Sequence, residues 1–584
     1  MYTVDTTLSY EGLTPQRALY VLVEVKFAGQ TFRWSTQPVS ILNSDGEWLR
    51  FDGGLNELEH ESFLQTLSDS PDQNSISLDL LWPVDVAKLV SEGHDLSAAT
   101  GEVSVWLHSD EYEARQVLIK GLVKTPNYGG FNDPVSFTIE EAPFQDVGLW
   151  PRATERVDSK TWPTHREADG GRSYPVIVGR PGVLSRSDGT YFASGTKALV
   201  VESDPSDNTQ ASTLLIAGHR ICSDFVQVRW RNPAPGSGYP RSGRVDFGGS
   251  GAVNYWGPVE FIQDGLGQWV SVVRVDSYIV PELRQSTYFD IIWAADIGDE
   301  TKGGLVWKDD TRCARGAGDV MAVALRQSSL RVDWGRLNAA RARMNAWRLD
   351  GFISARVQPW EWVVDNLLPL MPVSMHSGPL GLYPVFWRYN ALTSDAIDVI
   401  SWGPGVVRVS NVEYDRGPSE LCNSVLLKYG FDSVAGTHQR SVIHGPTADP
   451  EDLEQVTSEY SKRSAIRYGR TAKREMTSEI IIDDATACMT TNWMMIEQGF
   501  AHRSVEYEVP QRFSYLQLGD VVLLNDEEIH LQGAVALVQG VTLTDTGRIK
   551  LTLQLVENVA RASRTKGPNP DTGAPDPGVY AGEN

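Results

Sequence analysis

The stretch that decides the fold runs from Gly499 to Val556; it contains Arg503-Ser504-Val505-Glu506-Tyr507-Glu508-Val509 and closes on Arg548-Ile549-Lys550-Leu551-Thr552-Leu553-Gln554-Leu555. In both runs apolar residues alternate with polar ones, and this period of two predicts half-buried antiparallel strands. Leu518-Gly519-Asp520 predicts a tight bend before an apolar strand, and Gly533, Gly540 and Gly547 predict turns between short strands. We therefore expect a small β-barrel or sandwich here, with no obvious catalytic group.

The composition indicates a large, strand-rich protein. A chain of 584 residues exceeds one hydrophobic core, so we expect roughly three to five domains. The 52 glycines, 31 prolines and 18 tryptophans favour short strands, many turns and large aromatic contact surfaces. The four cysteines stand far apart, which predicts buried free thiols and not a disulfide scaffold or a zinc ribbon. Neither a membrane span nor a signal peptide is evident, so we expect a soluble protein made in a reducing cytoplasm.

The charge is strongly acidic. The net charge is −23, and residues 1–150 hold 23 acids against 8 bases. This excludes a conventional nucleic-acid binder, which would present a basic face to phosphates. Two interpretations stay open: an ordinary solubilising surface, or an acidic wall that repels another polyanion.

Strand, turn and helix patterns divide the chain into successive regions. Within the first region a hairpin is expected around Ala28-Gly29-Gln30, and one short helix is expected after Pro83. The expected organisation is a β domain at 1–150, a polar linker at 151–172, a β-rich insertion at 173–305, a helical α+β section at 306–405, a second β domain at 406–560 and a flexible Pro/Gly-rich tail at 561–584. The expected fold class is mainly β with α+β portions, in several domains.

Helix signals concentrate in the second half. Asp333 predicts the cap of a helix over 334–349, Pro359 the first turn of another, and Asp483-Asp484 the cap of a helix over 485–498. The polar excursion from Asp432 to Tyr460 predicts a loop with partial helix. Two residue sets receive a structural interpretation: a solvated basic helix face (Arg336, Arg341, Arg343, Arg348) and an aromatic core (Trp347, Trp360, Trp362, Trp387, Tyr389).

A search for chemistry finds weak candidates. Gly248-Gly249-Ser250-Gly251 misses the nucleophile-elbow pattern because Ala252 replaces the last glycine. His219 has no second histidine nearby, which favours a hydrogen-bonded strand-end residue over a ligand. The acids from Asp449 to Glu454 suit a helix N-terminus better than a cation site, and Cys488 is expected to be buried and not paired with His502. We therefore expect no enzyme and no catalytic, cofactor or metal site.

With catalysis set aside, the order of parts resembles the baseplate hub, or tail-tip hub, of tailed bacteriophages and gene transfer agents. The residues that carry the resemblance are the opening Tyr174 to Gly182, the helix start Gly316-Ala317-Gly318-Asp319-Val320, the helical section around Asp333 and Trp360, and the C-terminal block from Tyr468-Gly469 through Ile481, Ala485, Phe513 and Leu518-Gly519-Asp520. The similarity spans most of residues 1–560 and is one of layout.

This resemblance implies a homotrimer whose subunit carries two tail-tube-like β-barrels. Six barrels in a trimer would let a threefold ring match a sixfold tube. The implied partners are a distal tail or tail-tube hexamer above and a tip fibre, central fibre or spike below, in a virion assembled in the bacterial cytoplasm. A noncontractile, siphovirus-like tail is a further expectation.

DNA would pass through the ring without specific binding, because three copies carry 3 × −23 = −69 charges. The acids that we expect to line the channel are Glu57, Glu59, Glu61, Asp110, Glu111 and Glu113.

Two other functions stay open. The Trp- and Gly-rich insertion at 173–305 is the expected binding module if the protein is a receptor- or carbohydrate-binding tail protein. A cell-wall-degrading enzyme would instead need paired carboxylates across a cleft.

Overall fold

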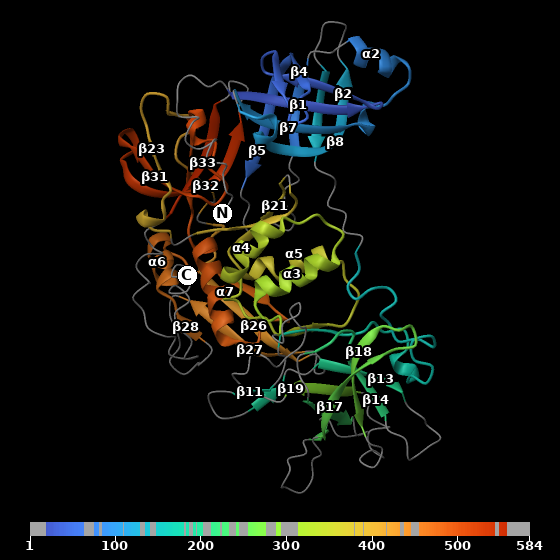
Figure 1. The fold of residues 1–584 in the computed structure, drawn as a ribbon. Helices are drawn as coiled ribbons and strands as arrows, with labels where there is room; N and C mark the ends of the chain where they lie inside the picture. The colour runs from blue at the N-terminus through green and yellow to red at the C-terminus, as the bar shows by residue number, and fades with distance from the viewer. Residues whose placement is uncertain are drawn as a thin grey trace.

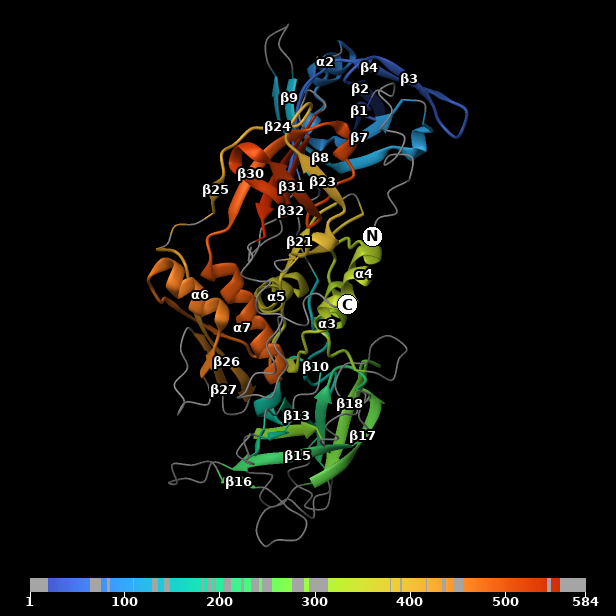
Figure 2. The same cartoon turned by 90° about the vertical axis from the view of Figure 1, so that its left-hand side faces the viewer.

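The computed structural model describes residues 19–556 except 64–74, 81–83, 109, 129–134, 141–147, 180–182, 186–190, 194–195, 203–211, 222–224, 233–240, 244–254, 276–287, 294–312, 379, 389–390, 416, 418, 433–436, 446–454 and 544–547. The fold is mainly β, multidomain and carries a helical section, as the sequence predicts. Strands from the two ends of the chain lie together in one layer, helices fill the middle, and the insertion lies at the opposite end (Figures 1 and 2).

The first strand-rich region begins with the predicted hairpin. Its strands are β1 (Leu19–Phe27), β2 (Gln30–Ser35), β3 (Val39–Leu42), β4 (Trp48–Gly53), β5 (Leu55–Phe63), β6 (Ser75–Leu80), β7 (Thr100–Leu107), β8 (Gln116–Tyr128) and β9 (Val135–Glu140). The turn between β1 and β2 places Ala28 and Gly29 at positive φ, as a two-residue hairpin turn requires. The helix expected after Pro83 is α2 (Val84–Ser91), and a short 3-10 helix, η3 (Tyr112–Ala114), connects β7 to β8.

The last region supplies a second set of strands. They are β23 (Asp398–Ser401), β24 (Val407–Arg408), β25 (Glu413–Tyr414), β30 (Arg503–Val509), β31 (Val521–Asp526), β32 (Leu531–Leu543) and β33 (Ile549–Leu555). The alternation that opens the sequence analysis is confirmed, because Val505, Tyr507 and Val509 are buried while Glu506 and Glu508 are half-buried.

The two sets of strands form a single sheet of 16 strands. Its path runs β24-β30-β33-β32-β5-β6-β9-β8-β7-β1-β2-β4-β3, and the seam is an antiparallel pairing of β32 with β5. One hydrophobic cluster spans the seam, with Ile76 and Ile139 from the first region and Tyr507 and Leu553 from the last. The ends of the chain therefore share one sheet and one core.

Helices cover the middle of the molecule. They are α3 (Ala317–Gln327), α4 (Trp334–Met344), α5 (Pro359–Asn366) and α7 (Asp484–Gly499). The predicted caps are confirmed: the Asp333 carboxylate accepts from the N–H of Arg336 at 3.0 Å, and that of Asp483 from Thr486 at 2.9 Å. Four tryptophans predicted as core are buried, namely Trp347, Trp360, Trp362 and Trp387, whereas Tyr389 lies outside the described residues.

The helical section continues into short strands. These are β20 (Gly351–Ile353), which pairs with β10 (Val176–Val178), and the pair β21 (Val373–His376) and β22 (Tyr383–Phe386).

The insertion forms its own sheet. Its strands are β13 (Thr196–Glu202), β14 (Ser212–Ala217), β15 (Phe225–Asn232), β16 (Arg241–Gly243), β17 (Tyr255–Gln263), β18 (Trp269–Val275) and β19 (Tyr288–Trp293), beside the small hairpin β11 (Val183–Ser185) and β12 (Tyr191–Ala193). The order is β16-β15-β17-β18-β14-β13-β19, and an additional pairing of β19 with β15 closes six of these strands into a barrel. Closure removes the exposed edges that an open sheet would present.

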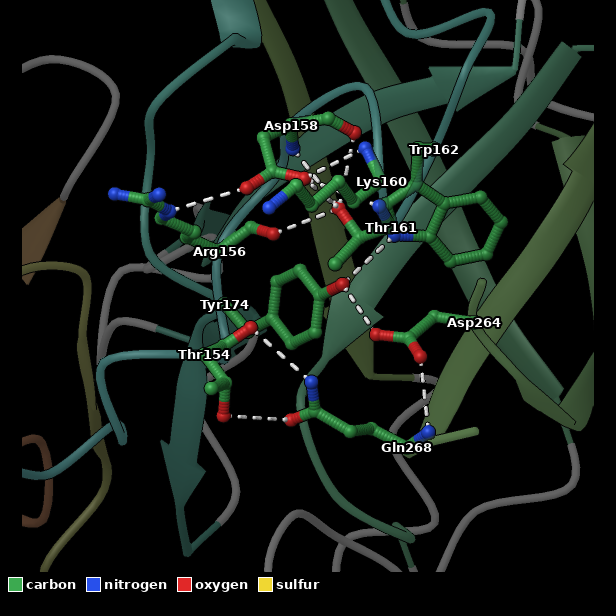
Figure 3. A network of polar contacts seen from close by, with 9 residues as sticks. All are labelled: Thr154, Arg156, Asp158, Lys160, Thr161, Trp162, Tyr174, Asp264 and Gln268. Atoms are coloured by element: carbon green, nitrogen blue, oxygen red, sulfur yellow. Dashed lines mark hydrogen bonds and ion pairs between the residues drawn. The ribbon is translucent and has the colours of Figure 1, made fainter. Parts of the chain in front are cut away.

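The segment expected as a linker is packed against the insertion. The Tyr174 hydroxyl donates to the Asp264 carboxylate at 2.7 Å and accepts from the Trp162 indole N–H at 3.0 Å (Figure 3). Asp264 also accepts the backbone N–H of Gln268 at 2.9 Å. These contacts tie residues before the barrel to the turn between β17 and β18.

Four local predictions are wrong. Gly533 and Gly540 do not mark turns between strands: both lie inside the 13-residue strand β32, near register shifts in its pairing with β31 and with β33, because a glycine accommodates a bulge. Gly547 lies outside the described residues. The run 432–460 is not mainly loop, because it contains β27 (Thr437–Gly445) and β28 (Gln455–Thr457), which join β26 (Ser424–Asp432) and β29 (Lys473–Thr477) in a sheet against α7 and α6 (Glu459–Tyr468). The helix predicted over 334–349 is shorter than expected, because it ends at Met344.

The fourth correction concerns the arginines of α4, which do not form a solvated face. Arg341 forms an ion pair with the buried Asp319 at 3.2 Å, and Arg336 stacks over the ring of Tyr383 at 4.0 Å. These guanidinium groups are partly buried because their partners belong to the helical section itself.

Candidate functional site: the polar face of the shared sheet

The strongest candidate for function is the face of the shared sheet that points away from its core. In each strand, residues with buried side chains alternate with residues that lie on this second face. Cross-strand pairing aligns these positions in rows, for example Glu508–Lys550–Thr542 on one side of the seam and Ser77–Thr138–Lys124 on the other. Charged and hydroxyl-bearing residues thus continue across the seam between the two ends of the chain.

Three of the acids expected to line a channel lie in the middle of this face. Glu57, Glu59 and Glu61 occupy alternate positions of β5, the strand at the seam. Glu59 pairs with Ser77 and Glu61 pairs with Thr542. Directly paired residues of antiparallel strands share one face of the sheet. These three positions are therefore brought together with the polar rows of both regions.

The other three expected acids lie at the far end of the same side. Asp110, Glu111 and Glu113 belong to the segment around η3, and β6, β9 and β8 separate β5 from the strand β7 that precedes it. Neighbouring strands lie about 4.8 Å apart, so four strand steps separate β5 from β7 by roughly 20 Å. The structure does not bring the two groups of acids into contact through any described pairing.

The segment around η3 is fixed to the polar face by a buried tyrosine. The Tyr112 hydroxyl donates a hydrogen bond to Glu24 of β1. Burial is the largest cause that raises the pKa of Tyr112, and this hydrogen bond is the next largest. Arg115 donates to Glu102 of β7 at 2.8 Å. Glu113 reaches the turn between β3 and β4, where it accepts the N–H of Ser44 at 2.9 Å, and this hydrogen bond lowers the pKa of Glu113.

Carboxylates at both ends of the face are paired with bases. Glu506 lies 3.1 Å from Lys550, and Glu508 lies 3.7 Å from Arg548. At the other end Glu102 also contacts Lys120 at 3.2 Å, and Glu24 contacts Arg33 at 3.2 Å. Bases at the two ends of the face therefore offset the acidic excess that we expected there. An excess of negative charge on this face would have to come from the glutamates of β5.

Sequence reasoning missed several members of this face, including Glu24, Asp79, Glu102, Glu140, Glu506 and Glu508. The alternation around Val505 and Tyr507 contains the signal for the last two. The others depend on which strands pair, which a single sequence does not specify.

A second feature of interest is a group of exposed apolar side chains in the segment from Ile397 to Tyr414. They are Ile397, Val399, Trp402, Val407, Val409 and Tyr414, with exposed fractions between 41% and 58%. β23 pairs with β31, whereas β24 and β25 pair with β30, so the group borders the last region on two sides. Exposed apolar side chains that gather in one segment form contacts with other proteins.

The candidates for chemistry do not assemble into a catalytic site among the described residues. The imidazole of His219 accepts the N–H of Ile177 at 3.0 Å and donates to the carbonyl of Arg220, and burial lowers its pKa to about 4, so it is a hydrogen-bonded neutral residue. Cys488 is 1% exposed in the core around α3 and α5, whereas His502 contacts Glu497 and the ring of Trp387. The segments 248–252 and 449–454 lie outside the described residues.

The cysteines in the described part of the chain form no disulfide. Cys313 and Cys488 are buried, Cys422 is half-buried, and Cys222 lies outside the described residues. No group of three His, Cys, Asp or Glu side chains there is placed to hold a metal ion. In the described helices no segment has both the length and the apolar character of a membrane span.

Comparison with known proteins gives low similarity. No protein-family model matches the chain, and no curated protein matches it. Among solved structures, a tail protein from Neisseria meningitidis MC58 is 10% identical over 92% of this chain and 97% of that chain, with a TM-score of 0.33.

Two further solved structures match over much of the chain. The 43 kDa tail protein of prophage MuSo2 from Shewanella oneidensis is 9% identical over 92% of this chain and 98% of that chain, with a TM-score of 0.34. A chain of the native gene transfer agent virion is 13% identical over 69% of this chain and 88% of that chain, with a TM-score of 0.36. At these scores the likeness does not by itself assign a function to this chain.

Proposed function

We propose that this chain is the structural hub subunit of a phage tail tip or baseplate, forming a trimeric ring that joins the tail to the tip and lines the DNA-ejection channel. The observation that carries the proposal is the pairing of β5 with β32, which makes strands from both ends of one subunit into a single curved layer with a continuous polar face. A ring built from such layers would present that face to its lumen.

The chemistry of the polar face suits a channel for DNA. Three bases of this face, Lys550, Arg548 and Lys120, are each engaged by a carboxylate, which weakens the hold that they would have on phosphates. In the proposed ring Glu57, Glu59 and Glu61 lie in the middle of the channel wall. Asp110, Glu111 and Glu113 lie toward one end of the same wall.

The exposed apolar residues between Ile397 and Tyr414 support a role in assembly. They include Trp402 and Tyr414, and aromatic residues of this type anchor protein interfaces. We propose that they contact a neighbouring component of the tail, either the distal tail or tail-tube hexamer above or the fibre or spike below. A virion location and an origin in the host cytoplasm follow from the same proposal.

The test is the mass and shape of the full-length protein. We expect an assembly of 3 × 64.6 kDa = 193.8 kDa and, in electron micrographs, a ring with an open bore. Glu57→Lys together with Glu59→Lys is expected to leave the ring intact but to slow DNA ejection from particles that carry it. A monomer at all concentrations tested, or a closed particle without a bore, would overturn the proposal.

One observation favours a second function for the insertion. Phe261 and Trp269 stack with ring centroids 4.9 Å apart and are 38% and 52% exposed, beside the exposed Arg220. Exposed aromatic faces with polar neighbours suit binding of a sugar ring. We propose glycan binding here as the alternative function. Trp269→Ala should abolish binding of the full-length protein to host polysaccharide, whereas Trp402→Ala, at an exposed tryptophan (43%) outside the insertion, should not.

A further inference from the structure

Helix α6 and the following strand β29 carry a basic surface that the proposed function does not use. Residues 459–475 hold six bases and two acids in a chain whose net charge is −23. The bases are Lys462, Arg463, Arg467, Arg470, Lys473 and Arg474. We call the four bases of α6 and its C-terminal end, Lys462, Arg463, Arg467 and Arg470, together with Ile466, the α6 surface.

An apolar side chain lies at the centre of this surface. Arg463, Ile466 and Arg467 follow the spacing i, i+3, i+4 and so share one side of α6, while Ser461 on the other side is buried. All three are exposed, and Ile466 is 83% exposed, the largest exposed fraction among the large hydrophobic residues that the structure describes. The α6 surface therefore combines an apolar centre with a rim of guanidinium and ammonium groups.

The complementary arrangement occurs at one end of the path of the shared sheet, on the hairpin of β3 and β4. Leu42 and Trp48 pair directly across this hairpin and are 47% and 70% exposed. Asp45 and Glu47 are exposed in the turn between them. The tip of the hairpin is an apolar centre with a carboxylate rim.

We propose that the α6 surface of one copy of this chain binds the β3–β4 hairpin tip of a second copy. Opposite charges surround the apolar groups on the two surfaces, and an exposed tryptophan offers its ring face to arginine. The two surfaces lie on opposite sides of one molecule, with α6 at the left and β3 at the right in Figure 2. The contact therefore joins different copies head to tail, and such contacts close into rings when the rotation permits.

This inference rests on the proposed ring and names the contact that would hold neighbouring subunits together. Its charged rim is exposed to solvent, so the association should weaken as salt shortens the Debye length from about 10 Å at 0.1 M to about 3 Å at 1 M. The apolar centre, in contrast, should be insensitive to salt, and Trp48→Ala should weaken association at every salt concentration.

The experiment is a charge swap in the full-length protein, read by sedimentation velocity over a series of concentrations. Arg463→Glu with Arg467→Glu should weaken association about tenfold or more, and so should Asp45→Lys with Glu47→Lys. All four substitutions in one chain restore opposite charges across the contact and should recover association. Arg331→Glu with Arg356→Glu changes the net charge equally at exposed positions of the helical section and serves as the matched control.

The outcomes separate this inference from the proposed function. A trimer that survives either reversal as well as it survives the control overturns the contact while leaving the hub proposal standing. Reversals that dissociate the trimer without recovery in the four-substitution variant also overturn the contact. A wild-type chain that stays monomeric overturns both.

Discussion

Thr542 of β32 and Glu61 of β5 are directly paired in the shared sheet, although they come from opposite ends of the chain. On its other side Thr542 pairs with Lys550 of β33, so it lies in a strand with two partners. The sheet of the first region is therefore completed only when the last region has been made. Contacts of such large sequence separation require closure of a long loop, which predicts slow folding.

Proline at the seam tests this dependence. Thr542→Pro removes a backbone donor from a strand with partners on both sides, so we expect the free energy of unfolding to fall by about 3 kcal/mol or more. Urea unfolding followed by tryptophan fluorescence measures the change. Ser40→Pro is the control, because β3 has one partner strand in the described sheet and should tolerate proline better. Equal losses from both variants would contradict the prediction.

Asp526 closes the last region through a buried polar network. Its carboxylate accepts the Tyr507 hydroxyl at 2.7 Å and Arg408 at 2.8 Å, and its side chain is fully buried. Asp526→Ala leaves the buried Tyr507 hydroxyl without this acceptor and leaves Arg408 paired with Glu528 alone at 3.0 Å, so it should cost about 3 kcal/mol. Tyr507→Phe removes one hydrogen bond and should cost only about 1 kcal/mol. Guanidinium unfolding of the two variants compares them, and a cost for Tyr507→Phe that matches Asp526→Ala would show that the ion pair contributes little.

The sequence predicts the local elements of this fold well, because their signals are local. Asp333 and Asp483 mark helix starts, Ala28-Gly29 marks the first hairpin, and the alternation around Tyr507 marks β30. Each of these depends on residues within one turn or one strand. The mainly β, multidomain class follows from the sum of such elements.

The pairing of strands from distant parts of the chain could not be predicted from local sequence patterns. The pairing of Thr542 with Glu61 has no signature in either strand, and a single sequence offers no coupled substitutions to reveal it. The same reason explains Gly540: a glycine in a strand is a turn signal when the partners are unknown and a bulge when they are known. The candidate face was therefore predictable strand by strand but not as a surface.

Gly179 directly follows β10, at the point where the chain leaves its pairing with β20 of the helical section and precedes the insertion strands. It has φ of +63°, and a Cβ built there would lie 1.9 Å from the carbonyl oxygen of Leu349. Gly179→Ala must therefore move the backbone and should cost several kcal/mol, about 3 or more. Gly46→Ala is the matched control, because Gly46 also has positive φ (+80°) but has open space around it, and should cost about 1 kcal/mol. Thermal unfolding of both variants measures the difference, and equal shifts in Tm would contradict the close approach.

The buried His376 and His444 and the half-buried His219 predict a loss of stability in mild acid. Burial lowers the pKa of His219 and His444 to about 4, and burial together with the nearby Arg336 lowers that of His376 to about 4. An unfolded histidine titrates near 6.5. Between these values the unfolded chain binds more protons than the folded one, so stability rises with pH there.

The expected profile is flat above about pH 6.5 and declines as pH falls toward about 4, with each histidine contributing about 3 kcal/mol at most. His444 gives the sharpest test, because neither of its ring nitrogens has a hydrogen-bond partner among the described residues. Between pH 6.5 and 4.5, the slope of the free energy of unfolding against pH, measured by urea unfolding, should correspond to one proton fewer in His444→Leu than in the wild type. Leucine does not titrate, so its burial does not require the release of a proton. Replacement of the exposed His94 by glutamine provides the control. If His444→Leu keeps the wild-type slope, the buried imidazole does not set the acid sensitivity of the fold.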